Sequence, residues 1–211
     1  MRVLLIGFSK ELTQFIVELV RAGTDVAVVD SDSNRVEGLR RELDIATFVG
    51  DLLDLDLYKE IGMPRTDVVI AAHTNDLINI VVCSYAKYLG VPRIIAVVND
   101  NKVASILREL GLANEIIVKP SELSTILKER LYNMKEMEIA QNQLLILLDS
   151  SIHTKLVDKS IEELTEMGGQ VIFIIDKENN VIYPNKEYKI QRADKIFILT
   201  SSQNIQRIIG L

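Results

Sequence analysis

The chain has 211 residues, 48% of them apolar, and a formal net charge of −6 at pH 7. That length suits one large or two small domains with real hydrophobic cores. Acidic residues outnumber basic ones both before Lys135 (19 against 15) and from Lys135 onward (11 against 9). Neither half therefore carries the basic excess that is typical of a nucleic-acid-binding module.

Cysteine content and hydropathy indicate the compartment. A single cysteine, Cys83, excludes an internal disulfide framework and fits a reducing cytoplasm. The longest apolar runs, such as 68–72 and 144–148, are far shorter than the roughly 20 residues needed to cross a bilayer. The first six residues lead straight into a glycine turn and do not resemble a signal peptide. We therefore expect a cytoplasmic protein with no direct membrane insertion.

The first 120 residues alternate between short apolar runs and helical patterns. Apolar residues between Leu12 and Val20 recur at helical spacing, and 76–89 and 101–110 repeat the pattern, each followed by a glycine that suits a C-terminal cap, Gly90 or Gly111. Buried parallel strands are short and apolar. The predicted strands are 2–6, 25–30, 47–49, 68–71, 94–98 and 115–118. This order predicts an α/β fold with a Rossmann-like, doubly wound parallel sheet.

The opening 32 residues read as a nucleotide-binding βαβ unit that has lost part of its motif. Asp30 lies 23 residues after Gly7, where such units keep the acid that holds a ribose hydroxyl. The turn that should read G-x-G-x-x-G reads GFSKEL, so only the first glycine remains. Ser9 adds a Cβ where a pyrophosphate comes closest, and Leu12 is expected to hold helix and strand apart. A mononucleotide is therefore easier to accommodate than a dinucleotide.

The second part of the chain predicts a small α+β domain. Residues 121–137 form a charged helix that can bridge two domains, with Ser121 as a possible cap and an apolar face at helical spacing. We place the first domain at 1–134 and the second at 138–211, and a domain of about 70 residues holds a core only marginally, so pairing with another copy would help it. The expected elements after the helix are strands at 143–149, 170–176, 180–184 and 195–200, a hairpin turn at 177–180 and a helix near 160–167.

Nearly the whole chain resembles a known family. The βαβ opening, the Val49-Gly50-Asp51 segment, the run AAHTNDLINIVVCSYAKYLGVPRIIAVVNDN and the tail NVIYPNKEYKIQRADKIFILTSS occur in the order typical of it. Together they resemble the RCK (regulator of potassium conductance) proteins of Trk- and Ktr-type potassium uptake systems. The resemblance implies a first domain that binds an adenine nucleotide, ATP, ADP or NAD(H), and a C-terminal domain that in some members binds cyclic di-AMP.

The resemblance also implies a binding site at the carboxyl end of the sheet. Gly7 and Phe8 would form the phosphate turn with Ser9, and Lys10 would add a cation. Asp30 would accept from ribose hydroxyls, and Asp76 and Asn79 match a recurrent D-x-x-N. The remaining cofactor-binding candidates are Ser31, Arg35, Gly50, Asp51, Leu52, Ala72, His73, Thr74 and Asn75. We expect AMP, ADP or ATP rather than NAD(H), and no catalytic or metal residues.

Several of these residues also have an ordinary structural interpretation. Asp30 could cap the following turn, and His73 could be a hydrogen-bonding loop residue. Cys83 is expected to be a buried packing residue, and His153 a solvated one. The three aspartates at 51, 54 and 56 suggest a solvated face rather than a cation site, and two histidines and one cysteine far apart give no zinc spacing.

The predicted function is that of a cytoplasmic gating subunit of a potassium uptake transporter or channel, peripheral to the inner face of the cell membrane. Its expected partners are a membrane potassium-translocating subunit and further RCK copies, in a homo-oligomeric or mixed ring, octameric by resemblance. The alternatives are a nucleotide-free structural subunit of a mixed ring and an NAD(H)-dependent oxidoreductase. An enzyme is disfavoured because the chain lacks a Tyr-x-x-x-Lys dyad, a G-x-S-x-G elbow and a P-loop.

Overall fold

The computed structural model describes residues 1–210, which form two compact units. The first unit is Met1–Glu122, and the second begins at Leu123. The expected division after residue 134 therefore lies downstream of the observed one. The reason is that the second half of the linking helix, and the strand that follows it, belong to the second unit.

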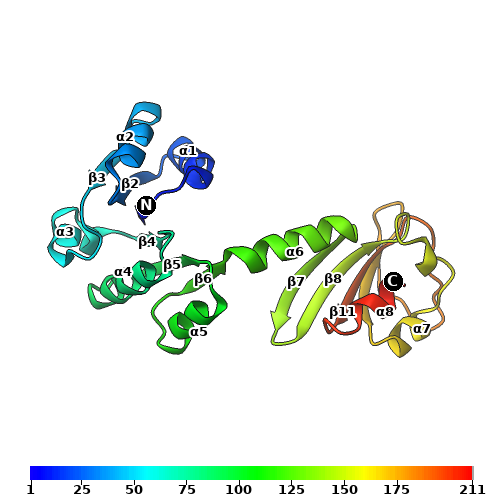
Figure 1. The fold of residues 1–211 in the computed structure, drawn as a ribbon. Helices are drawn as coiled ribbons and strands as arrows, with labels where there is room; N and C mark the ends of the chain where they lie inside the picture. Colours follow the sequence, from blue (N-terminus) through cyan, green and yellow to red (C-terminus); the bar gives the residue numbers. More distant parts are fainter. Residues whose placement is uncertain (211) are drawn as a thin grey trace. The chain divides into compact units, whose positions relative to one another are not determined.

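The first unit is built on a six-stranded sheet with the order β3-β2-β1-β4-β5-β6, all neighbours parallel (Figure 1). All six predicted strands are confirmed, two of them starting one residue earlier than expected. The bounds are β1 Arg2–Ile6, β2 Asp25–Asp30, β3 Ala46–Val49, β4 Val68–Ala71, β5 Arg93–Val98 and β6 Glu115–Val118. The order reverses between β1 and β4, which makes their carboxyl ends the switch point of the sheet.

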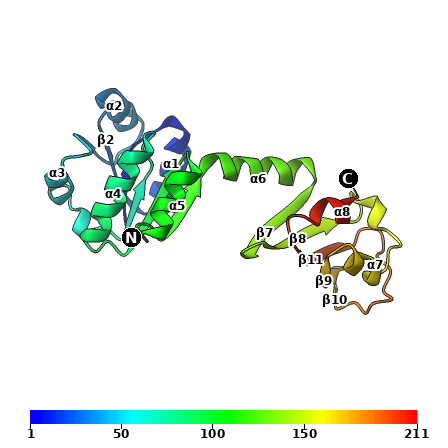
Figure 2. The same cartoon turned by 60° about the horizontal axis from the view of Figure 1, so that its bottom comes forward.

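Helices cover both faces of this sheet, as predicted (Figure 2). Ile16 and Leu39, from α1 and α2, pack on one face, while Tyr58 and Cys83, from α3 and α4, pack on the other. The helices are α1 Thr13–Arg21, α2 Ser33–Glu42, α3 Leu55–Glu60, α4 Asp76–Tyr88 and α5 Asn101–Glu109. Cys83 is fully buried, and burial raises the pKa of its thiol to about 12, so it is a packing residue and not a nucleophile.

The glycines after α4 and α5 end these helices as predicted. Gly90 has φ +76° and Gly111 has φ +59°, the left-handed conformation that glycine adopts without a Cβ clash. Their N–H groups donate to the carbonyls of Lys87 and Arg108 in the last turns of the helices. These bonds satisfy carbonyls that would otherwise lack a partner.

The linking helix is shorter than predicted, and its end is a strand. Helix α6 spans Lys119–Leu131, so Ser121 lies inside it and does not cap it. Asn133 then takes φ +48°, which turns the chain, and residues Met134–Ala140 form strand β7. The prediction of helix through Met137 was wrong because β7 finds a full antiparallel partner in the next strand, a contact that local periodicity does not reveal.

The second unit is a five-stranded antiparallel sheet with the order β10-β9-β11-β8-β7. Three predicted strands are confirmed, whereas the predicted strand 180–184 contracts to two residues and α8 was not predicted. The bounds are β8 Gln143–Asp149, β9 Gln170–Ile175, β10 Val181–Ile182, β11 Lys195–Thr200, α7 Ile161–Glu166 and α8 Ile205–Ile209. The predicted hairpin turn is present, with Asn179 at φ +66° and the Asp176 N–H bonded to the Asn180 carbonyl.

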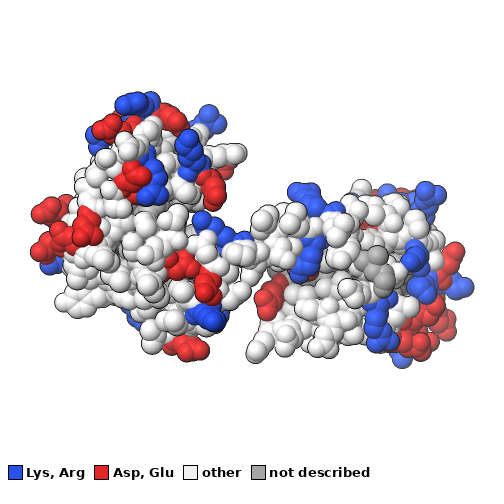
Figure 3. Space-filling model, in the orientation of Figure 1, with Lys and Arg blue, Asp and Glu red and all other residues white. Residues whose placement is uncertain are grey.

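The surface carries charges of both signs. On the face shown in Figure 3, basic and acidic groups are interspersed on each unit, without a broad basic area. None of the helices within residues 1–210 is both long enough and apolar enough to span a membrane.

The buried tyrosine of α3 provides a test of the first core. Tyr58 is fully buried, and its hydroxyl donates to the Leu52 carbonyl at 2.6 Å. Tyr58→Phe leaves that carbonyl without its partner and is expected to lower the free energy of unfolding by about 1–2 kcal/mol. Tyr88→Phe, at a residue that is 80% exposed, is the matched control and should change the free energy of unfolding by less than about 0.5 kcal/mol. Urea unfolding followed by circular dichroism measures both, and equal effects would contradict the assignment.

Candidate functional site

Gly7 brings the ends of β1 and β4 into direct contact. Its φ is +82°, and its N–H donates to the Val29 carbonyl of β2 at 2.8 Å. A Cβ at this position would lie 2.3 Å from the Cα of His73, far inside any real contact distance. Glycine is therefore required here by the approach of the β4 loop as well as by the turn.

The chain after Gly7 differs from a regular phosphate-binding turn. A 3-10 turn at Lys10–Leu12 comes first, and α1 begins only at Thr13. Leu12, which replaces the third glycine, packs against the apolar cluster beneath α1 and α2. Ser9, which replaces the second, has an enclosed hydroxyl with no hydrogen-bond partner among the described residues. Ser9 therefore occupies space that the complete motif leaves open for a pyrophosphate, and Leu12 occupies space that it leaves for close packing of helix and strand.

Asp30 ends β2 and is fully buried. Its Oδ2 accepts the Phe8 N–H at 2.6 Å, and its Oδ1 accepts the Asp32 N–H at 2.8 Å. The Arg35 Nη2 lies 3.0 Å from the same Oδ1. The acid predicted to hold a ribose is thus engaged by three groups of its own chain.

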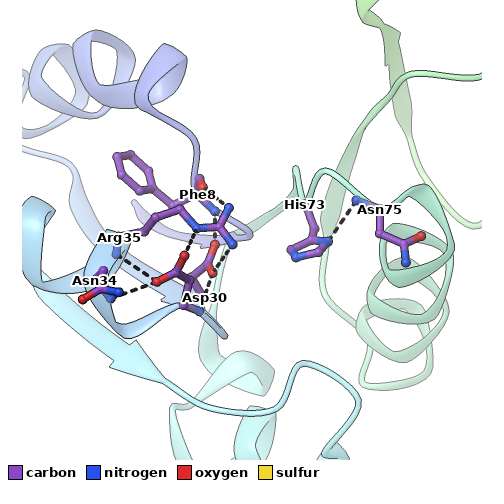
Figure 4. Close-up of polar contacts among 7 residues, drawn as sticks. Phe8, Asp30, Asn34, Arg35, His73 and Asn75 are labelled. Carbon is purple, nitrogen blue, oxygen red and sulfur yellow. Dashed lines mark hydrogen bonds and ion pairs between the residues drawn. The ribbon is translucent and has the colours of Figure 1, made fainter.

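Arg35 ties the glycine turn to the start of α2. Its Nη1 donates to the Phe8 carbonyl at 3.1 Å, and its Nε lies 3.2 Å from the Asp32 carboxylate, a close charge contact without hydrogen-bond alignment. Asp32 in turn caps α2 by accepting the Asn34 N–H at 2.9 Å. Figure 4 shows Phe8, Asp30, Asn34 and Arg35 close together on the β2 side, with His73 across from them in the loop after β4. We call Phe8, Asp30, Asp32 and Arg35 the Asp30 clasp.

The segment predicted to flank an adenine is only partly accessible. The Gly50 N–H donates to the Asp30 carbonyl at 3.2 Å, which continues the pairing of β3 with β2. Leu52 is a core residue, so only its backbone can face a ligand. Asp51 is exposed and turns the chain by accepting the Leu53 N–H at 2.9 Å. Ser31, directly after Asp30, is also exposed.

The loop after β4 is held in place by its own hydrogen bonds. Ala72 is buried, while Thr74 and Asn75 are exposed. The His73 Nδ1 accepts the Asn75 N–H at 3.0 Å, which assigns the ring proton of a neutral imidazole to Nε2. Asn75 caps α4 through the Leu77 N–H at 3.0 Å. His73 thus makes a hydrogen bond within its own loop, and its contact with a ligand stays a prediction.

The D-x-x-N pair fastens two loops to one edge of the sheet. Asn79 is fully buried; its amide donates to the carbonyls of His73 and Val97 at 2.8 and 3.1 Å. The Asp76 carboxylate accepts the N–H groups of Asn99 and Asp100, each at 2.9 Å. The sequence marks both residues as a motif but does not reveal this role, because Val97, Asn99 and Asp100 lie 18 to 24 residues away.

A groove of about 520 Å³ lies beside the clasp, between the start of α1 and helix α2. It brings together two predicted cations, Lys10 and Arg35, and is open to one acid, Glu42. Its other lining residues are Phe8, Thr13, Asn34, Gly38 and Leu39. The groove does not include Gly50–Leu52, which follow β3, or Ala72–Asn75, which follow β4, so it brings together only part of the predicted residues.

Family models match both units of the chain. The TrkA-N domain matches residues 3–119, and the TrkA-C domain matches residues 151–211. The chain belongs to the TrkA-N domain family. The resemblance to RCK proteins is thereby confirmed. The TrkA-N match covers the parallel sheet of the first unit, and the TrkA-C match lies within the second unit.

Individual relatives agree with this family. The chain is 22% identical to the Trk system potassium uptake protein TrkA of Azorhizobium caulinodans, over 91% of the chain and 43% of that relative. It is 21% identical to the TrkA homolog of Methanothermobacter thermautotrophicus, over 89% of the chain and 88% of that relative. The chain therefore spans less than half of some relatives and nearly all of others. The names of these relatives describe potassium uptake proteins.

Solved structures share the fold. The GsuK channel bound to NAD matches with a TM-score of 0.63 and 18% identity, over 100% of the chain and 39% of that protein. A GsuK structure bound to ADP matches with a TM-score of 0.53 and 22% identity, over 62% of the chain and 33% of that protein. At this identity the likeness establishes the fold of the TrkA-N chain and leaves its ligands to be argued from its own residues.

The contact between the β1 and β4 loops predicts a large difference between two glycine substitutions. Gly7→Ala places a Cβ against the His73 backbone and is expected to lower the free energy of unfolding by more than about 4 kcal/mol. Gly23→Ala has a similar φ of +77° but open space around its Cβ, so only the conformational cost of about 1–2 kcal/mol is expected. Thermal unfolding of both variants tests this, and similar melting temperatures would contradict the close approach.

Proposed function

We propose that this chain is a cytoplasmic regulatory subunit of a potassium uptake system, gated by an adenine nucleotide bound to its first unit. The proposal depends most on one observation: TrkA-N and TrkA-C models match the two units in order. In the first unit, Gly7 follows β1 at the switch point of the sheet, and Asp30 ends the neighbouring strand β2. Open parallel sheets bind ligands at that edge.

The residues at this edge fit a nucleotide in part. Ser9, Lys10 and Glu11 begin the 3-10 turn, where N–H groups of a first helical turn lack intrahelical partners and attract phosphate. Lys10 adds a cation beside them. The exposed parts of Ser31, Asp51 and Thr74 line the approaches from β2, β3 and β4. A phosphate at the turn and an adenine toward Gly50 would span this edge.

The Asp30 clasp favours a mononucleotide over a dinucleotide. A ribose can reach the buried carboxylate only if the Arg35 guanidinium gives way, and each charge-assisted hydrogen bond it makes contributes roughly 1.5–3 kcal/mol. A pyrophosphate must in addition displace the side chain of Ser9. AMP, which has no pyrophosphate, avoids the second rearrangement; ADP has one but lacks the second nucleoside that NAD must also fit. GsuK, which shares the fold, has been solved with NAD and with ADP.

Gating by such a site follows from population shift. A nucleotide that binds two conformations of an oligomer unequally biases them by its differential affinity. Full reversal of a two-state gate takes about 5.5 kcal/mol, which one weak site does not supply but several identical subunits do in sum. We therefore propose an RCK ring, homomeric or mixed, in contact with a membrane potassium-translocating subunit. Cyclic di-AMP at the second unit stays a prediction from the resemblance.

A second candidate function has support of its own. The closed clasp, with Asp30 fully buried and paired, would also suit a nucleotide-free structural subunit of a mixed ring. In that case Asp30 and Arg35 serve only to fasten β1 to α2, and a second RCK protein with a complete glycine motif would supply the ligand response.

A thermal-shift screen with AMP, ADP, ATP, NAD, NADH and cyclic di-AMP separates these candidates when it is read with the mass in solution. A ligand that binds only the folded state raises its stability, by about 2.7 kcal/mol at 100 times its Kd. We expect stabilisation by AMP or ADP in an oligomer. A response to none of the nucleotides would favour the structural subunit.

Asp30→Asn tests the acid itself, because it keeps the size of the side chain and removes its charge. We expect the nucleotide-induced shift to be lost and the apo protein to melt at a lower temperature, since the Arg35 pair is broken. Asp100→Asn, which alters an exposed helix cap at the same edge, is the matched control and should keep the full response. An unchanged response in Asp30→Asn would remove Asp30 from the site.

A further inference from the structure

Strand β7 points apolar side chains outward and an acidic side chain inward, the reverse of the usual pattern of a half-buried strand. Met137 and Ile139, 59% and 56% exposed, face outward, whereas Glu136 lies on the side of buried Met134. The Glu136 side chain is only 9% exposed. Acids are rarely placed on the interior side of a strand unless they are paired, and departures from the local pattern concentrate at functional sites.

Glu136 is poorly satisfied by its own chain. Its Oε1 lies 3.4 Å from the Nζ of Lys128, a long contact to a side chain that is half exposed. Its Oε2 is enclosed and has no hydrogen-bond partner among residues 1–210. The neighbouring Glu129 is buried to a similar degree but fully engaged, with Lys135 at 2.7 Å and the Glu136 N–H at 3.1 Å. A buried carboxylate without donors costs free energy that a bound donor would recover.

Glu136 borders a cavity of about 510 Å³ within the second unit. This volume lies in the range of small-molecule sites. Its apolar wall continues the core through Met134, Leu144 and Ile205, with Tyr132 beside them. Its polar wall is made by Lys128, Glu136, Glu138, Asn142, Ser202, Gln203 and Gln206. The cavity thus combines an apolar floor with a few polar groups that converge on it, as binding sites do.

The charges of the lining define the class of ligand. Two carboxylates face a single ammonium, so the lining carries one net negative charge. The amide and hydroxyl groups can pair with a ligand hydroxyl. Among residues 1–210 no three His, Cys, Asp or Glu side chains gather as a metal site would require, and the net charge disfavours an anion such as a nucleotide. Lys128 already places an ammonium at this carboxylate, which is the chemistry that the ligand would repeat.

We propose that this cavity binds a small organic ammonium ion, with N–H groups donating to Glu136 and a hydroxyl pairing with the amides around Gln203 and Gln206. Lys128 is a competitor that the ligand displaces from the carboxylate. This site is separate from the proposed nucleotide site, since every lining residue belongs to the second unit.

The test is titration calorimetry and thermal shift of the full chain with ethanolammonium chloride at constant ionic strength. We expect saturable binding and stabilisation of the folded state. Tetramethylammonium chloride has the same charge without N–H donors, and potassium chloride supplies an inorganic cation; neither should match the effect. An equal response to either salt, or no response to ethanolammonium, would overturn the proposal.

Two substitutions should act in opposite directions. Glu136→Gln keeps the size of the side chain and removes the charge, so it should weaken ethanolammonium binding by at least about tenfold without lowering the melting temperature. Lys128→Met removes the competitor and should strengthen binding. Glu162→Gln, on the exposed side of α7, is the matched control and should bind like the original chain. Binding that Glu136→Gln leaves unchanged would place the ligand elsewhere and refute the site.

Discussion

The buried carboxylate of Asp30 is the interaction on which the first unit depends. It joins three segments that meet at the switch point, because it accepts from Phe8 after β1, from Asp32 before α2 and from the Arg35 side chain within α2. A fully buried charge survives only when such partners replace its hydration. Because this carboxylate is fully buried, a ribose hydroxyl in the proposed nucleotide site would reach it only after part of this arrangement opened.

Much of the first unit could be predicted from the sequence because its strands are short, apolar and separated by amphipathic helices. Gly7, Asp30 and the cap glycines are local signals, and each is found where the pattern places it. The Asp30 clasp was not predictable in the same way: Arg35 is five residues from Asp30, but its bond to the Phe8 carbonyl joins residues 27 apart. The partners of Asp76 and Asn79, at the end of β5 and directly after it, were missed for the same reason.

The second unit shows where periodicity fails. Residues 134–137 continue the charged pattern of α6, so the sequence favours helix, yet the left-handed Asn133 ends the turn and β7 pairs with β8. A half-buried strand is normally recognised by apolar residues on its inner side and polar residues on its outer side, and β7 has acids inside and apolar residues outside. The candidate site at Glu136 was missed for the same reason. An acid in an exposed charged helix needs no partner, whereas an acid on the inner face of a strand requires one.

The two units differ in how fully a buried acid is paired within the chain. This difference distinguishes an acid that has a structural role from one that is free to bind a ligand. In the first unit Asp30 is neutralised by Arg35 and two N–H groups, so the apo state is complete and a ligand must compete with existing bonds. In the second, Glu136 has one long contact to a lysine that solvent can reach, so a ligand adds bonds that the chain does not make. If both proposed sites bind their ligands, nucleotide affinity is expected to fall as the Arg35–Asp30 pair strengthens, and ammonium affinity to rise as the Lys128–Glu136 pair weakens.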